Sequence, residues 1–369
     1  MILRQFLSTV IVLHALVLGH CVAQDKSMVP LADPFILLEG DTYYAYGTGD
    51  PSGIAVWTSK DLQEWRQADQ LALHKSNTTE EQWFWAPEVY HRNGQYYMYY
   101  SANEHLYVAT STSPLGPFKQ VGGPMMEPLI GYEKCIDSSV FFDDDGQAYC
   151  FFVRFTDGNC IWMCQLEADM TTPVEGTLSK CINVSQLWEE QLGRVNEGPF
   201  VLKQNGIYYL TYSGNDYRSQ DYAVGYAMTR TLHPTTGAAP TWSKNTGNPI
   251  VRRVENLLGT GHHSFFTDKE GRLRIVFHAH NSETSVAPRL MYIGTMEFQG
   301  NKLIMTDDPI IRPTLPNSSA IQTEKAESHG PSAFFSLAGR RLPAVAPGLH
   351  VALQPTGKGH AKIVRGDKR

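Results

Sequence analysis

The chain has 369 residues, of which 42% are hydrophobic and 11% aromatic. This is enough to bury a core in one large domain or two ordinary ones. The formal net charge is -6, and Lys and Arg are scattered along the sequence, so neither a phosphate-binding surface nor nucleic acid as a partner is indicated.

The first 23 residues are predicted to be a signal peptide, with an apolar run "FLSTVIVLHALVLG" and cleavage after Ala23. His14 and His20 interrupt this stretch, which is too short for a clean membrane span. Cys21 would suit a lipoprotein, but His20 stands where a small residue is expected. We therefore predict an exported protein without a membrane span, in the periplasm, on the cell surface or outside the cell.

A pattern then recurs five times along the chain. Each copy has an acid or His, an apolar run, a turn with Gly and a second run rich in Tyr or β-branched residues. The copies are "ADPFILLEGDTYYAYGT" from Ala32, "APEVYHRNGQYYMYYS" from Ala86, "IDSSVFFDDDGQAYCFF" from Ile136, "NEGPFVLKQNGIYYLTYS" from Asn196 and "GTGHHSFFTDKEGRLRIVFH" from Gly259. Each copy is typical of a β-hairpin.

Further strand-like runs separate the copies: "GIAVWTS", "LYVATSTS", "IWMCQLE", "YAVGYAMT" and "RLMYIGTMEF". Four short strands therefore repeat about every 50–60 residues, and patterns of helical period are nearly absent. The sequence predicts an all-β fold, a five-bladed β-propeller over residues 28–310.

Five cysteines remain after the signal peptide: Cys135, Cys150, Cys160, Cys164 and Cys181. One or two disulfides could form in an oxidising compartment, although an odd number leaves at least one thiol unpaired. Burial as small hydrophobic side chains is the alternative that we favour for most of them. No ligand pattern for zinc accompanies them.

The blade pattern ends near residue 310. Residues 311–331 are polar and rich in Pro and Ser, as in a linker. Residues 332–369 form a basic, strand-like tail that does not repeat the blades. Its strings "SLAGRRL" and "APGLHV" partly resemble the C-terminal sorting domains of exported Bacteroidetes proteins, which would imply a bacterial source. A small disordered or structural extension is the alternative.

Each copy opens with an acid or His: Asp33, Glu88, Asp137, Glu197 or His262. In a propeller the innermost strand of each blade lines a central channel. If all five copies use one register, these side chains converge on one funnel. Convergent carboxylates suit glycoside hydrolysis, which needs one protonated acid for the leaving oxygen and one ionised acid to activate water or attack carbon.

The strings "LADPFIL", "FWAPEVY", "CIDSSVFFDDDG", "VNEGPFVLKQNGIYYLTYS" and "GTGHHSFF" together resemble the motif series of glycoside hydrolase family 43. The resemblance covers Val29 to Pro309 in the family's order. It implies a five-bladed propeller and an inverting hydrolase. Members act mostly as α-L-arabinofuranosidases, β-D-xylosidases or endo-arabinanases, and some act on galactan.

The resemblance also implies roles for single residues. Asp33 matches the general base, Glu197 the general acid, and Asp137 the acid that orients Glu197 and raises its pKa. Arg289 resembles an arginine that contacts the terminal sugar. His262 matches a channel residue that often lies near a bound calcium ion or other cation, commonly through water.

Other positions leave alternatives open. Trp85 either stacks on a sugar or is an ordinary buried Trp. Glu88 either binds substrate or shapes the funnel wall. Ser138 stands where the family usually has Pro, which loosens the turn slightly but keeps the carboxylate of Asp137.

The histidines leave a similar choice. His262 lies near a metal or is a structural channel residue without one. We expect His263, His278 and His280 to be structural or peripheral.

Together these features predict an inverting, exo-acting glycoside hydrolase that releases α-L-arabinofuranose or β-D-xylose, with its two catalytic carboxyls about 6.5–9.5 Å apart. No cofactor is needed for this chemistry, although a structural calcium ion in the channel is compatible with it. Action on galactofuranose or galactan, or sugar binding without catalysis, are the alternatives. Retaining fructan-cleaving propellers resemble motifs that this chain lacks. The sequence indicates no oligomeric state.

Overall fold

The computed structural model describes residues 27–232 and 240–316, and the backbone of four strands between Ala333 and Gly366. The chain divides into two compact units, Met1–Asn317 and Ser318–Arg369. The predicted signal peptide, 1–23, and most of the predicted linker lie outside the described residues.

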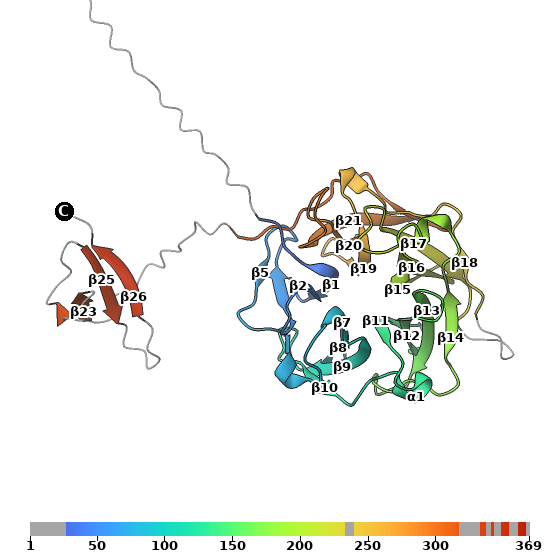
Figure 1. Ribbon diagram of the computed structural model, residues 1–369, viewed down its shortest axis with the longest axis horizontal. Coiled ribbons are helices and arrows are strands. Elements are labelled where there is room, and N and C mark those ends of the chain that lie inside the picture. Colours follow the sequence, from blue (N-terminus) through green and yellow to red (C-terminus); the bar gives the residue numbers. More distant parts are fainter. Residues whose placement is uncertain are drawn as a thin grey trace, which may run out of the picture. The chain divides into compact units, whose positions relative to one another are not determined.

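The first unit is a five-bladed β-propeller, which confirms the predicted fold (Figure 1). Each blade is a four-stranded antiparallel sheet, and the strands β1, β7, β11, β15 and β19 surround the centre. The strands of the first three blades are β1 (Ala32–Glu39), β2 (Thr42–Thr48), β4 (Val56–Ser59), β5 (Arg66–Gln67); β7 (Trp85–Arg92), β8 (Gln95–Ala102), β9 (His105–Ser111), β10 (Lys119–Val121); β11 (Cys135–Phe142), β12 (Ala148–Arg154), β13 (Cys160–Leu166) and β14 (Ser179–Ile182). Those of the last two are β15 (Asn196–Gln204), β16 (Ile207–Gly214), β17 (Ala223–Thr229), β18 (Ser243–Lys244); β19 (Gly261–Thr267), β20 (Leu273–Ala279), β21 (Leu290–Gln299) and β22 (Lys302–Met305).

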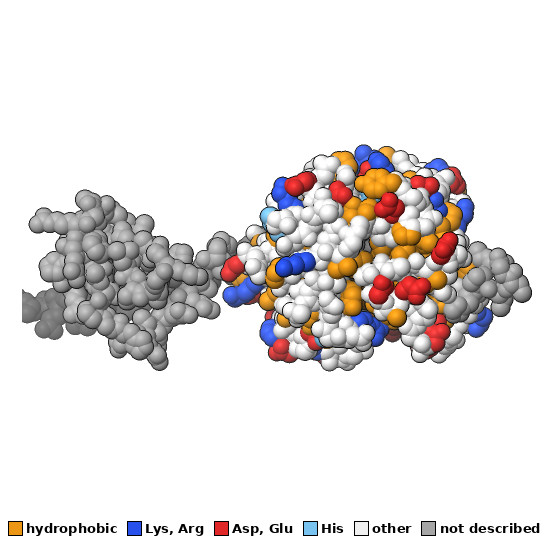
Figure 2. Space-filling view, turned by 90° about the horizontal axis from the view of Figure 1, so that it is seen from below, with side chains coloured by type: hydrophobic (Ala, Val, Ile, Leu, Met, Phe, Trp, Pro, Cys, Tyr) orange, Lys and Arg blue, Asp and Glu red, His pale blue; other side chains and the backbone are white. Residues whose placement is uncertain are grey.

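A few short elements complete the unit: β3 (Gly53–Ile54), β6 (Leu73–His74), α1 (Glu127–Ile130) and the 3-10 turns η1 (Lys75–Asn77), η2 (Leu187–Glu189) and η4 (Val254–Asn256). No helix in the described part of the chain is long and apolar enough to cross a membrane. Figure 2 shows one face of the molecule, where Lys and Arg are interspersed with Asp and Glu rather than gathered into a basic patch.

The hairpin turns lie where the Gly-containing strings predict them. Asn93-Gly94 and Asn205-Gly206 join their strands with two residues each, and all four residues have positive φ. Two successive positive φ values define the type I′ turn, whose twist matches that of paired strands.

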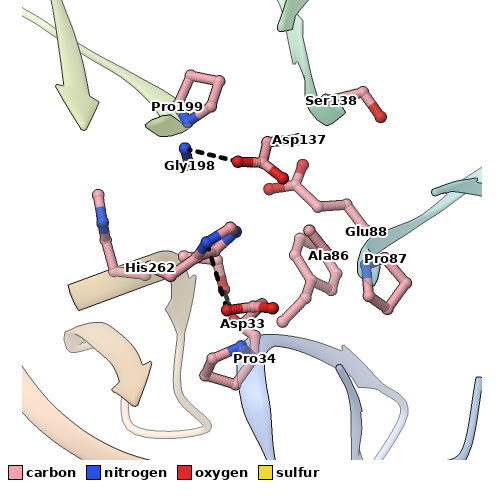
Figure 3. Close-up of a pocket in the computed structure, with 13 residues that line it drawn as sticks. Asp33, Pro34, Ala86, Pro87, Glu88, Asp137, Ser138, Gly198, Pro199 and His262 are labelled. Carbon is pink, nitrogen blue, oxygen red and sulfur yellow. Dashed lines mark hydrogen bonds and ion pairs between the residues drawn. The ribbon is translucent and has the colours of Figure 1, made fainter. Parts of the chain in front are cut away.

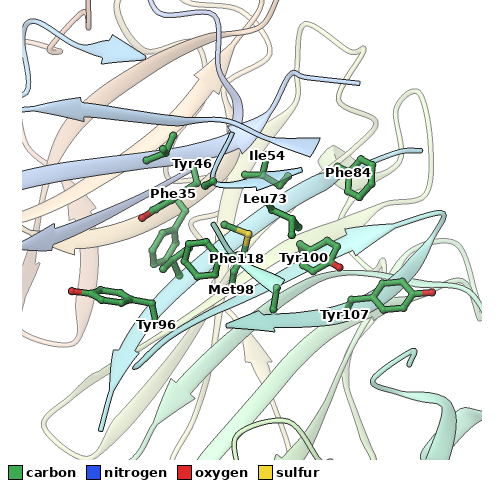
Figure 4. Close-up of a cluster of buried hydrophobic side chains, with 14 of the residues drawn as sticks. Phe35, Tyr46, Ile54, Leu73, Phe84, Tyr96, Met98, Tyr100, Tyr107 and Phe118 are labelled. Atoms are coloured by element: carbon green, nitrogen blue, oxygen red, sulfur yellow. The ribbon is translucent and has the colours of Figure 1, made fainter. Parts of the chain in front are cut away.

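The cores lie between neighbouring blades. In the first interface, Phe35 and Tyr46 of blade 1 pack in one buried cluster with Met98 and Tyr100 of blade 2 (Figure 4). Burying one such side chain contributes about 1.5–3 kcal/mol. Because each blade buries its faces against its neighbours, the ring of five blades stabilises the position of every innermost strand.

The ring closes by a short antiparallel contact between the two ends of the unit. Val29 N–H donates to Pro313 O (3.0 Å), and Leu315 N–H donates to Ser27 O (2.8 Å). Thr314 N–H donates to Gln63 O (2.8 Å) on the outer side of blade 1. Residues 311–316 therefore belong to the propeller, so the predicted boundary at 310 lies a few residues too early.

The five mature cysteines are free thiols on or near blade 3, and four of them are buried. Cys150 and Cys164 face each other on β12 and β13, and burial raises the pKa of both thiols. This agrees with burial as small hydrophobic side chains.

The second unit contains a four-stranded antiparallel sheet in the order β24-β23-β25-β26. Its strands are β23 (Ala333–Ser336), β24 (Arg341–Leu342), β25 (Gly348–Leu353) and β26 (Ala361–Gly366). The strand-like tail is thus a sheet, and its sorting role stays a prediction.

Candidate active site

Each innermost strand contains a β-bulge near its start. The extra residue follows Ala32, Trp85, Ile136, Glu197 and Gly261. The next residue in each blade has a positive φ between 42° and 56°: Asp33, Ala86, Asp137, Gly198 and His262. Bulges redirect side chains and are frequent beside active sites.

The expected common register of the five acidic or His residues is wrong in two blades. Asp33, Asp137 and His262 occupy the positive-φ position. Glu197 comes one residue before that position, and Glu88 comes two residues after it. The sequence motifs aligned residues by type, whereas strand pairing sets the register. Glu88 consequently lies further along the channel than Glu197.

Two cavities lie at this end of the channel. The mouth cavity has a volume of about 230 Å³ and is lined by Asp33, Trp85, Ile136, Asp137, Glu197, Tyr217, His262 and Arg289. The inner cavity, of about 10 Å³, has room for about one water molecule. It shares Asp33, Asp137 and His262 with the mouth cavity and adds Glu88 (Figure 3). Of the sequence-predicted site residues, only Glu88 is absent from the mouth cavity.

Asp33 is buried among basic side chains. Its Oδ1 lies 2.7 Å from Arg289 Nη1 and 3.3 Å from the Nδ1 atoms of both His262 and His278. Burial raises the pKa of Asp33, but Arg289 and the two histidines outweigh burial and hold it well below its ordinary value of 3.8. Asp33 is therefore ionised at neutral pH, as a general base must be.

Glu197 has the opposite electrostatic environment. Burial, opposed by hydrogen bonds from Tyr222 and Asn159 and assisted by the negative charge of Asp33, raises the pKa of Glu197 to about 7. Tyr222 Oη lies 2.9 Å from Glu197 Oε1, and Asn159 Nδ2 lies 3.0 Å from Oε2. Glu197 thus retains a proton in mildly acidic solution, as a general acid must.

Asp137 is coupled to Glu197. Burial and then the charges of Glu197 and Asp33 raise the pKa of Asp137 well above its ordinary value. A 3.4 Å hydrogen bond from Gly198 N–H opposes this shift. The charge of Glu197 thus raises the pKa of Asp137, whereas the carboxylate that chiefly raises the pKa of Glu197 is Asp33, so the expected effect of Asp137 on Glu197 stays a prediction.

Trp85 and Arg289 line the mouth cavity, where a sugar ring would contact them. The Arg289 guanidinium also lies over the Tyr217 ring, 4.7 Å from its centroid. Because Arg289 is bound to Asp33 and Tyr217 together, its side chain is held in one orientation.

Glu88 lies in the inner cavity only. Burial raises the pKa of Glu88 to about 8, and the Tyr90 hydroxyl donates a hydrogen bond to it. Glu88 is therefore neutral at pH 7 and forms part of the channel wall. This placement favours the wall-shaping alternative over direct contact with substrate.

His262 contacts Asp33 through Nδ1, and burial lowers the pKa of His262. Within the described residues, no group of three or more His, Cys, Asp or Glu side chains is placed to hold a metal ion. A cation beside His262 would thus depend mainly on water ligands, as the family resemblance implies. That cation stays a prediction, and no catalytic step below uses it.

The sequence motifs missed three residues that contact the catalytic carboxyls. His278, expected to be structural or peripheral, touches Asp33, and its ring stacks with that of Tyr222 (centroids 5.7 Å apart). Tyr222 and Asn159 hold Glu197. His278 ends the fifth repeated string and Tyr222 opens the run "YAVGYAMT", but neither is the acid or His that opens a copy, and Asn159 lies outside the quoted strings.

A buried ion pair supports the start of β15. Lys244 Nζ lies 2.7 Å from Glu189 and 2.9 Å from Asn196 Oδ1, and the Tyr212 hydroxyl donates to Glu189 (2.6 Å). Asn196 directly precedes Glu197, so this network fixes the backbone that carries the acid. Breaking one partner of such a pair costs about 3–5 kcal/mol.

These protonation states predict the pH dependence of activity. In the roles that the family resemblance implies, the active form has Glu197 protonated and Asp33 ionised. We expect kcat/KM to fall about tenfold per pH unit above about 7, as Glu197 loses its proton. The acidic decline should come only below about pH 3.8, because Asp33 must gain a proton for it. A pH–rate profile on an aryl glycoside checks both limbs.

The control is Glu197→Ala with a substrate whose leaving group needs no protonation. Its profile should lack the alkaline limb. If the variant still loses activity above about pH 7, the group that titrates there is not Glu197.

The family model for glycosyl hydrolases family 43 matches residues 28–303. The chain belongs to glycoside hydrolase family 43. Members of this family hydrolyse glycosidic bonds, so the chain is a glycoside hydrolase. The match spans all five blades and includes Asp33, Asp137 and Glu197.

Three family relatives show the range of activities near this chain. A solved endo-1,4-β-xylanase structure from Bacteroides thetaiotaomicron VPI-5482 is 39% identical, covering 79% of this chain and 99% of that one, with a TM-score of 0.73. The extracellular exo-α-(1→5)-L-arabinofuranosidase ArbA of Cellvibrio japonicus is 27% identical over 71% of this chain and 82% of its own length. The β-D-galactofuranosidase xynD of Aspergillus niger is 27% identical over 72% and 79%.

Proposed function

We propose that this family 43 hydrolase is inverting and exo-acting, and that it releases α-L-arabinofuranose or β-D-xylose from the ends of plant-type polysaccharides or oligosaccharides. The observation that carries the proposal is the opposite protonation of two carboxyls lining one cavity. Asp33 is held ionised, and Glu197 keeps a proton up to about pH 7. Pairs with separated pKa values are the acid and base of many glycosidases.

In this mechanism, Glu197 donates its proton to the glycosidic oxygen while Asp33 removes a proton from a water on the opposite face of the sugar. That water forms the new bond to the anomeric carbon as the bond to the leaving oxygen breaks. One displacement inverts the anomeric carbon. Asn159 and Tyr222 hold Glu197 in place, and Arg289 keeps Asp33 ionised.

The size of the mouth cavity supports exo action. Pockets for drug-sized ligands run from about 300 to 1,000 Å³, and this cavity measures about 230 Å³. A cavity of this size suits one sugar ring, with the next sugar of the chain outside the cavity. Arabinofuranose is the first choice, because the chain matches exo-acting relatives named for it from Cellvibrio japonicus and Streptomyces avermitilis.

We also propose that the protein is exported. Several relatives are named as extracellular enzymes, and polymers of this kind lie outside the cell. The predicted signal peptide agrees with this.

The test is hydrolysis of aryl α-L-arabinofuranoside, β-D-xyloside and β-D-galactofuranoside by the wild type, with NMR detection of the first anomer released. We expect turnover of a pentoside with inversion. Retention would overturn the proposed mechanism. Turnover of the galactofuranoside alone would favour the alternative sugar, which the Aspergillus niger relative also suggests.

Exo action is tested on linear arabinan and xylan by the size of the first products. Monosaccharide alone from the start supports it, and early oligosaccharides would show endo cleavage. Binding of these polymers without any turnover would favour the sugar-binding alternative. A cation near His262 is tested by elemental analysis of the purified protein and by the effect of EDTA on its melting temperature.

A further inference from the structure

Trp83 is an exposed aromatic side chain beside the mouth cavity. It is 45% exposed, and its ring stacks on that of Trp85, with centroids 5.7 Å apart and planes 15° apart. Trp85 lines the mouth cavity, whereas Trp83 does not. The Trp pair therefore continues from the cavity to the surface.

The exposed position of Trp83 is held by the fold. Trp83 has a φ of 60°, a conformation that costs a bulky residue free energy. On one side of it, Gln82 O accepts a hydrogen bond from Asn103 N–H (3.1 Å), and on the other Phe84 is buried. Because the backbone is anchored on both sides, the side chain of Trp83 stays exposed to solvent, although burying it would be favourable.

Most other exposed large hydrophobic side chains of the described residues share this end of the propeller. They lie in the connections before the innermost strands or after the second strands: Tyr132, Phe155, Leu187, Leu192 and Tyr217. These connections open on the side where β1, β7, β11, β15 and β19 begin. A face of this kind suits a ligand larger than the mouth cavity.

We propose that Trp83 forms an outer subsite, where its ring stacks on the second sugar unit of a bound chain. The occupant is a neutral furanose or pyranose ring, whose C–H groups pack on an indole face. This inference rests on the proposed function, because one sugar in the mouth cavity places the next one outside it. The outer subsite then contributes to the preference for oligosaccharides over small glycosides.

The test compares Trp83→Ala with the wild type on arabino- and xylo-oligosaccharides and on a methyl glycoside, whose leaving group has no ring to stack on Trp83. We expect kcat/KM for the oligosaccharides to fall about tenfold more than for the methyl glycoside, mainly through KM. Leu115→Ala is the matched control, because Leu115 is an exposed hydrophobic residue between β9 and β10, at the other end of the propeller.

Equal losses on both substrate types would mean that Trp83 only supports Trp85, and no loss on either would also overturn the outer subsite. If the wild type hydrolyses none of these substrates, the proposed function fails separately. Calorimetric measurement of the affinity for the same oligosaccharides then tests the outer subsite. Equal affinity of the wild type and Trp83→Ala would refute it.

A second and independent inference comes from the contacts between blades. At four of the five blade junctions, the backbone N–H of the positive-φ residue donates to a side chain at one fixed position of the preceding blade. The pairs are Asp33 to His278, Ala86 to Thr48, Asp137 to Ser101 and His262 to Ser213, at 2.7–3.2 Å. Each acceptor lies opposite the first bulge residue of its own blade.

The fifth junction differs. The equivalent position is Val153, opposite Ile136, and its side chain has no acceptor atom. The N–H of Gly198 donates instead to Asp137 Oδ2 (3.4 Å). A Cβ at Gly198 would lie 3.2 Å from the His262 ring at a φ of 52°, so a larger residue would be strained at this position.

We infer that Val153 is a positioning residue for the catalytic carboxyl pair. Because Val153 cannot accept a hydrogen bond, the Gly198 N–H stays available to Asp137. That bond ties the Asp137 carboxyl to the residue directly after Glu197. The exception to the five-fold pattern thus falls at the junction that carries the general acid.

The test is Val153→Thr, which keeps the side-chain shape and adds the acceptor found at the other junctions. We expect kcat to fall about fivefold or more while KM changes less than twofold. Val153→Ala, which adds no acceptor, should lose less kcat even though it leaves a small cavity. Equal losses in both variants would indicate a packing role alone.

A crystal structure of Val153→Thr gives a readout that does not depend on activity. We expect Gly198 N–H to donate to the new hydroxyl and the Asp137 carboxyl to move away. An unchanged bond from Gly198 to Asp137 would overturn the inference.

Discussion

Replacing Glu197 with alanine is expected to lower kcat/KM by about 10²–10⁴-fold on oligosaccharides, whose leaving groups need a proton. Aryl glycosides with good leaving groups, such as dinitrophenyl, should lose less than about tenfold. The physical reason is that only a poor leaving oxygen gains from the proton that Glu197 holds up to about pH 7. Steady-state kinetics on a series of leaving groups measures this difference as a steeper dependence on leaving-group pKa.

Glu197→Gln is the matched control, because it keeps the size of the side chain and its contacts with Tyr222 and Asn159 but has no acidic proton. It should show the same dependence on leaving group as Glu197→Ala. A uniform loss over all leaving groups in both variants would contradict the role of general acid.

Asp33→Ala is expected to abolish measurable turnover, with a loss of at least about 10²–10⁴-fold in kcat on every substrate. Because the proposed role of Asp33 is to activate the attacking water, the quality of the leaving group should make little difference. The loss also includes the removal of the ionised partner of Arg289 and His278. Kinetics on the substrates used for Glu197→Ala gives a direct comparison.

Two controls separate chemistry from folding in this experiment. Asp33→Asn keeps the shape of the side chain, so an equal loss with an unchanged melting temperature assigns the effect to the missing carboxylate. Asp144→Ala removes an exposed carboxylate whose partner is Lys203, and it should retain full activity. Substantial hydrolysis by Asp33→Asn would reject Asp33 as the base.

Much of the fold follows from local sequence patterns. The five Gly-containing turns and the runs around them predicted the hairpins, because turn geometry and the alternation of strands depend on neighbouring residues. The turns at Asn93-Gly94 and Asn205-Gly206 lie where the sequence predicts them. The predicted end at residue 310 was early, because residues 311–316 are held by hydrogen bonds to Ser27, Val29 and Gln63, all distant in the sequence.

The candidate site was predicted in part. The motif strings located Asp33, Asp137 and Glu197, the family resemblance added Arg289, and the structure brings all four to one cavity. They did not predict that Glu88 lies deeper, because they aligned Glu88 with the opening acids although Ala86 holds the positive-φ position of this blade.

The number of blades, their order and the acids at their inner edges follow from the amino-acid sequence, since each of these is a local and repeated feature. Which acid carries a proton follows only from the three-dimensional arrangement. That choice depends on burial and on contacts between residues far apart in the sequence: Arg289 and His278 with Asp33, and Tyr222 and Asn159 with Glu197. A carboxyl's pKa is set by every charge and donor within a few ångströms, and neighbours in space here lie up to 256 positions apart in the chain.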